Sequence, residues 1–83
     1  MADIKDIKKE AKRLLDNAYK EVQQFGHSHA IDHLKQLKAL LKELKKDDLA
    51  RGVDAMIVEI EGDRTYGMFA LFSGIRDEIE RLS

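Results

Sequence analysis

Residues 55–72 read AMIVEIEGDRTYGMFALF, and this stretch decides which fold the sequence predicts. The pair Gly62-Asp63 lies in its middle. A two-residue loop that begins with glycine is typical of a type II′ turn, because the first central residue of that turn has a positive φ. With this loop, Glu61 faces Arg64 across the two flanking segments, and opposite charges are favourable cross-strand neighbours. The stretch therefore predicts a β-hairpin.

Side chains alternate across a strand, so the predicted hairpin has two faces. One face is almost wholly apolar and is expected to pack against the rest of the chain; it carries Met56, Val58, Ile60, Thr65, Phe69 and Leu71. The other is a predicted interaction surface, with an apolar centre of Ile57, Tyr66, Met68, Ala70 and Phe72 and a charged edge that includes Glu59 and Arg64. Because an isolated two-stranded hairpin is only marginally stable in water, this second face needs a cover. The cover is either another protein molecule or the last helix of the same chain.

The same region also fits a helical alternative. Apolar residues recur at helical spacing, at Leu49, Val53, Met56, Ile57 and Ile60 and again at Met68, Leu71, Phe72, Ile75, Ile79 and Leu82. This alternative is an all-α four-helix bundle in which Gly62-Asp63 forms a turn between helices. Gly52, Gly67 and Gly74 argue against it, because each glycine costs roughly 1 kcal/mol inside a helix. The β-branched and aromatic residues of the region also favour strands.

The first half of the chain predicts an antiparallel helical hairpin. Apolar residues recur three and four positions apart from Ile4 onward, which indicates a helix that Asp3 caps and that runs to about Phe25. Gly26 then occupies the position where a left-handed residue ends many helices. Ser28 is the predicted cap of the second helix, and the short link between the two helices makes them antiparallel neighbours.

The second predicted helix frays or restarts at Asp47-Asp48 and ends at Arg51. After the β-hairpin, Ser73 is the predicted cap of a short last helix that continues through Leu82. The predicted order is α-α-β-β-α, an α+β fold in a single domain over residues 1–83.

Composition excludes several classes of protein. The 83 residues contain no cysteine, which excludes disulfides and thiolate metal sites and favours a reducing, cytoplasmic location. We expect neither a signal peptide nor a membrane span, because charges recur throughout the N-terminal region and no apolar run approaches about 20 residues. The formal net charge is −1.

Three histidines form the most suggestive chemical cluster. His29 and His33 lie four residues apart on the second predicted helix, and His27 precedes them. This spacing suits a shared metal ion, but without cysteine or an HExxH pattern the zinc ligand set is incomplete. We therefore expect surface histidines, and no cofactor is predicted.

Two groups of residues suggest phosphate binding. Ser73, Gly74 and Arg76 begin the last predicted helix, and helix N-termini bind anions, although acidic residues follow directly. A basic stripe on the second helix comprises Lys35, Lys38, Lys42, Lys45 and Lys46. The near-neutral chain lacks the strongly basic character and interleaved aromatics of nucleic-acid-binding domains, so nucleic acid is not the expected partner.

No catalytic constellation is present in the sequence. The serines lie outside any GxSxG turn, and so short a chain has little room for a deep pocket. The leading hypothesis is a small, non-enzymatic regulator, inhibitor or adaptor that self-associates, as a dimer, through the apolar hairpin and also binds a larger protein target. The alternative is a binder of small ligands, nucleotides or nucleic-acid phosphates that uses the helix N-terminus at Ser73, Gly74 and Arg76 or the basic stripe of the second helix.

Overall fold

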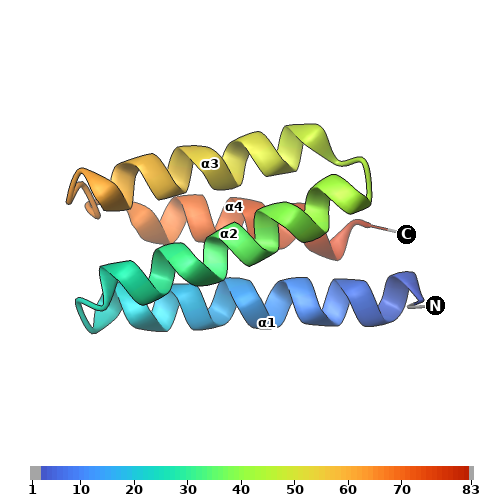
Figure 1. Ribbon diagram of the computed structural model, residues 1–83, viewed down its shortest axis with the longest axis horizontal. Helices are drawn as coiled ribbons and strands as arrows, with labels where there is room; N and C mark the ends of the chain where they lie inside the picture. The colour runs from blue at the N-terminus through green and yellow to red at the C-terminus, as the bar shows by residue number, and fades with distance from the viewer. Residues whose placement is uncertain (1–2, 83) are drawn as a thin grey trace.

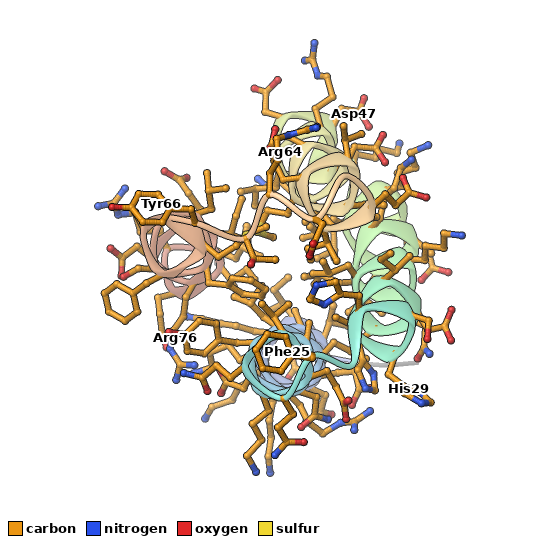
Figure 2. All side chains as sticks on the ribbon, turned by 90° about the vertical axis from the view of Figure 1, so that its left-hand side faces the viewer. Phe25, His29, Asp47, Arg64, Tyr66 and Arg76 are labelled. Atoms are coloured by element: carbon orange, nitrogen blue, oxygen red, sulfur yellow. The ribbon has the colours of Figure 1, made fainter. Side chains whose placement is uncertain are left out.

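The computed structural model describes residues 3–82, and these fold into four antiparallel α-helices (Figure 1). They are α1 (Ile4–Gln23), α2 (His27–Glu43), α3 (Asp47–Glu61) and α4 (Met68–Glu80). Each helix lies beside the next one in the chain, and α4 returns to lie beside α1, which closes the bundle (Figures 1 and 2). The bundle is elongated, with Cα extents of 36 × 19 × 18 Å.

The predicted β-hairpin, and with it the α+β class, is wrong: within the described residues no strand forms, and the four-helix alternative is correct. The physical reason lies in the period of burial. In a strand, Met56 and Ile57 would point to opposite faces, whereas both are buried here together with Val53 and Ile60. Only a helix places all four on one face. Burying a large apolar side chain contributes about 1.5–3 kcal/mol, which outweighs the cost of one helical glycine.

The turn at Gly62-Asp63 also differs from the predicted one. Gly62 has a φ of −86°, and Asp63 adopts the left-handed conformation with a φ of 58°. The amide of Arg64 donates to the carbonyl of Glu59 at 2.8 Å, which ends α3. The pair therefore joins two helices, as the helical alternative predicted.

Two of the glycines have specific positions in the bundle. Gly52 lies inside α3, where a Cβ atom would come within 2.8 Å of Cδ1 of Ile75, so the missing side chain gives α4 room to approach α3. Gly67 precedes α4 with a φ of 78°, a conformation that glycine adopts without strain.

Asp3 and Asp47 lie at helix starts as predicted, since Asp3 is the N-cap of α1 and α3 begins at Asp47. The predicted caps at Ser28 and Ser73 are wrong. Gly26 is the N-cap of α2, and Ser73 lies inside α4. The second helix ends at Glu43, well before Arg51.

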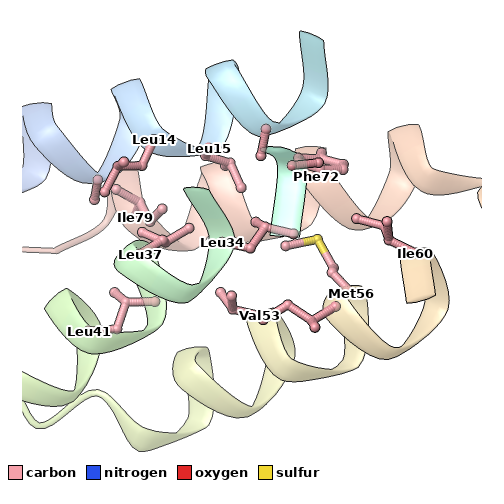
Figure 3. Close-up of a cluster of buried hydrophobic side chains, with 14 of the residues drawn as sticks. Leu14, Leu15, Leu34, Leu37, Leu41, Val53, Met56, Ile60, Phe72 and Ile79 are labelled. Carbon is pink, nitrogen blue, oxygen red and sulfur yellow. The ribbon is translucent and has the colours of Figure 1, made fainter. Parts of the chain in front are cut away.

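The core consists of apolar side chains from all four helices (Figure 3). The largest fully buried ones are Leu15, Leu34, Leu37, Leu41, Val53, Met56, Ile60 and Ile79. Among the described residues, no polar or charged side chain is buried. Hydrophobic burial is therefore the main source of stability.

Replacing Gly74 by alanine should raise the free energy of unfolding by about 1 kcal/mol, because Gly74 is an exposed residue inside α4 and alanine is the better helix former. A Cβ at this position meets no atom within 4 Å. The control is Gly67→Ala, which should lower the free energy of unfolding by about 1 kcal/mol or more, because of its positive φ. Urea unfolding followed by circular dichroism measures both. Equal effects of the two changes would contradict the assigned helix start.

Candidate functional site

All five aromatic residues of the chain belong to α1, α4 or the segments that adjoin them. Tyr19 lies in α1 and Phe25 follows its end, whereas Tyr66 precedes α4, which carries Phe69 and Phe72. Because α1 and α4 are antiparallel, the end of α1 lies beside the start of α4 (Figure 1). The Tyr19 ring centroid lies 5.1 Å from that of Phe72 and 6.2 Å from that of Phe69. These separations are typical of favourable aromatic pairs.

Two adjoining hollows follow the line where α1 meets α4, and both are lined by Tyr19 and Phe69. The first has a volume of about 290 Å³ and also contacts Leu15, Phe72 and the charged pair Asp16 and Arg76. The second has a volume of about 370 Å³ and also contacts Val22, Phe25, Thr65 and Met68. We call the two hollows together the aromatic groove.

The aromatic side chains around the groove are unusually exposed. Phe25 and Phe69, which line it, are 86% and 68% exposed, and Tyr66, which lines neither hollow, is fully exposed. Figure 2 shows Phe25 and Tyr66 at the end of the bundle that faces the viewer. Exposed aromatic side chains gathered at one place on a surface are typical of a binding site, because burying them in water-free contact is favourable.

The backbone at Phe25 is left-handed, as it is at Lys45 and Asp63, which occupy the corresponding positions after α2 and α3. Phe25 has a φ of 62°, in the left-handed region that favours glycine, whereas the neighbouring Gly26 has a φ of −87°. The prediction that Gly26 would adopt the left-handed conformation is therefore wrong. The amide of Gly26 donates to the carbonyl of Glu21 at 2.7 Å, which closes the turn after α1. This tight turn holds the Phe25 ring at the mouth of the groove.

Two ion pairs continue the line of the groove along α1 and α4. Nζ of Lys12 donates to Oε1 of Glu80 at 2.8 Å, and Arg76 donates to Asp16. The hydrogen bond from Lys12 lowers the pKa of the Glu80 carboxyl, and the hydrogen bond to Asp16 raises the pKa of Arg76. All four side chains are partly exposed, so each pair contributes little to stability, typically about 0–1 kcal/mol.

The structure does not assemble the predicted hairpin surface. Ile57, Met68 and Phe72 are buried in the bundle, and Tyr66 and Ala70 are exposed. At the predicted charged edge, Nε of Arg64 donates to Oε2 of Glu59 at 3.0 Å. Of these residues, Met68 and Phe72 line the aromatic groove.

The three histidines lie near one end of α2 without forming a metal site. Nε2 of His27 lies 3.0 Å from Oδ1 of Asp63, which links the start of α2 to the turn after α3. His29 is exposed and points away from the bundle in Figure 2, and His33 is half-buried. Across residues 3–82, no group of three or more potential ligands is placed to hold a metal ion.

The structure places the residues of the two predicted phosphate sites differently from the prediction. Ser73 and Gly74 lie inside α4, which begins at Met68, so they offer no free helix N-terminus. Arg76 is paired with Asp16. The basic stripe comprises Lys35, Lys38, Lys42, Lys45 and Lys46. Within it, Nζ of Lys38 forms an ion pair with Oδ1 of Asp54 on α3 at 2.7 Å.

Fold and groove together define a small antiparallel four-helix bundle with an exposed aromatic groove on one side. Comparisons of the chain with protein-family models, with curated proteins and with solved structures find no significant match. No helix among the described residues is long and apolar enough to cross a membrane. Sequence reasoning missed Tyr19, Phe25 and Phe69 as site residues. The available signal was the presence of two aromatics on either side of the end of the first helix, Tyr19 and Phe25, and of three more in residues 66–72.

Proposed function

We propose that this protein is a small, non-enzymatic interaction module that binds apolar side chains of a protein partner in the aromatic groove. The observation that supports this most is the exposure of Phe25 and Phe69, which line the two adjoining hollows. In water, such exposure is unfavourable for the isolated chain, and a partner that covers these rings removes the cost.

The polar groups of the groove favour binding over catalysis. Asp16 and Arg76 are the charged residues that line it, and they are bonded to each other. A general base or nucleophile needs a free or suitably activated group, and a paired carboxylate at an exposed site does not meet that need. We place the module in the cytoplasm, where a chain without cysteine loses nothing in a reducing environment.

The test is photo-crosslinking in cells from a photoreactive phenylalanine analogue placed at Phe69. We expect covalent adducts with protein, because this side chain lies in both hollows. The matched control carries the same analogue at Asp32, an exposed residue of α2, and should give none. Equal adducts from both positions, or none from Phe69, would contradict the proposal.

A further inference from the structure

The side of the bundle formed by α1 and α4 consists of three successive layers. In the first layer, Lys12 of α1 bonds to Glu80 of α4 at 2.8 Å. In the second, one turn further along α1, the signs are reversed, because Asp16 of α1 pairs with Arg76 of α4. In the third, Tyr19 packs against two phenylalanine rings of α4, at centroid distances of 5.1 and 6.2 Å. The three α1 residues are four and three positions apart, so they share one face of the helix.

This side is complementary to a copy of itself. A two-fold axis that runs parallel to the helices places α1 of one copy opposite α4 of the other, at the same height along the bundle. Lys12 then faces Glu80 of the partner subunit, and Asp16 faces Arg76 of the partner subunit. Around each layer the four charges alternate in sign, so every charge has opposite charges as its neighbours, which is favourable.

We propose that the partner in the aromatic groove is a second copy of this chain, bound about this two-fold axis. The inference rests on the proposed function and deepens it, because the same axis brings the aromatic layer of one copy onto the aromatic layer of the other. Phe69, which is 68% exposed in the single chain, is then covered. In a two-fold dimer the same surface serves both subunits, so one self-complementary patch is sufficient.

The aromatic layer argues against the other simple two-fold arrangement. A two-fold axis perpendicular to the helices, running across the interface from α1 to α4 between the two ion pairs, would also bring opposite charges together. It places Lys12 opposite Asp16 of the partner subunit. That axis reverses the second copy, however, and places Tyr19 opposite the start of α1, where a hollow is lined by Lys5, Asp6, Lys8, Lys9 and Lys12. The Tyr19 ring would then meet a largely charged surface, and Phe69, at the start of α4, would lie opposite a position beyond the end of α4 at Glu80 and remain uncovered. The axis parallel to the helices is therefore favoured.

The size and charge of the molecule suit this dimer. The bundle has Cα extents of 36 × 19 × 18 Å. The area of its long side is therefore comparable with the ~800 Å² that each partner buries in a stable interface. The net charge of −1 means that two copies repel each other little.

The experiment compares three forms of the full chain by sedimentation equilibrium at micromolar concentrations. The wild type should sediment with twice the chain mass of 9.5 kDa. The single variant Lys12→Glu places like charges together in two symmetry-related contacts, and it should raise the dimer dissociation constant about tenfold or more. The double variant Lys12→Glu with Glu80→Lys reverses the pair but keeps its signs alternating. It should restore the dissociation constant to nearly the wild-type value.

Two outcomes would overturn the dimer: a wild type that stays monomeric at every concentration, or a double variant that dimerises as weakly as the single one. A dimer about the perpendicular axis predicts the second outcome, because the reversed carboxylate would face Asp16 of the partner subunit. If the single variant fails to fold by circular dichroism, the double variant decides alone, since it keeps the ion pair within the chain. A monomeric wild type with crosslinks from Phe69 to other proteins would reject the dimer and leave the proposed function standing.

Discussion

Replacing Leu37 by alanine should lower the free energy of unfolding by about 2–5 kcal/mol. Leu37 lies in α2 with 0% of its surface exposed, within the cluster shown in Figure 3. The truncation removes buried methyl groups and leaves a cavity that the surrounding helices fill only in part. At roughly 0.05–0.15 kcal/mol per residue, a chain of this length has a total stability of about 4–12 kcal/mol, so the loss is a large fraction of it.

Urea unfolding followed by far-ultraviolet circular dichroism measures this change. The matched control is Leu71→Ala in α4, where the same truncation is made at a leucine that is 43% exposed. The control should lower the free energy of unfolding by much less, about 1 kcal/mol, because less apolar surface is lost and no closed cavity forms. Similar losses for the two variants would contradict the assigned core.

Replacing Phe72 by alanine should lower the free energy of unfolding by about 3–5 kcal/mol, whereas Phe69→Ala should lower it by about 1 kcal/mol or less. Both rings lie near Tyr19, at centroid distances of 5.1 and 6.2 Å. They differ in burial, because Phe72 is 5% exposed and Phe69 is 68% exposed. Phe72 therefore attaches α4 to the bundle, while Phe69 is available to a partner.

The comparison is made by thermal and urea unfolding at concentrations below the dimer dissociation constant. Association with a partner stabilises the folded chain, so at high concentration Phe69→Ala would acquire an additional loss that is unrelated to the folding of the monomer. A loss at Phe69 as large as that at Phe72, measured on the monomer, would show that Phe69 belongs to the core and would remove the basis of the proposed site.

The sequence predicted the first half of the fold well and the second half wrongly. In residues 4–44, apolar side chains recur only at helical spacing, so no competing pattern exists. In residues 53–60, a strand period through Met56, Val58 and Ile60 competes with a helix period through Val53, Met56, Ile57 and Ile60. The choice depends on tertiary packing, because Val58 is 54% exposed and Ile57 is buried. Local propensity does not contain that information.

The glycines biased the prediction for a related reason. Gly52 has an unfavourable helix propensity, but the absence of its side chain allows Ile75 of α4 to approach α3 closely. The low helix propensity of Gly52 can be read from the sequence, but the contact between Gly52 and Ile75 depends on the tertiary structure. Likewise, the aromatic groove joins residues about fifty positions apart, and its existence depends on α4 lying beside α1.

The first and last helices are antiparallel neighbours, so α1 begins and α4 ends at the same end of the bundle (Figure 1). Phe25 and Tyr66 lie at the other end, beyond the C-terminus of α1 and before the N-terminus of α4. An affinity tag or fluorescent fusion at either terminus would therefore be attached far from these rings. A short peptide linker between the termini would also allow circular permutants, in which new termini are opened in the turns without altering how the helices pack.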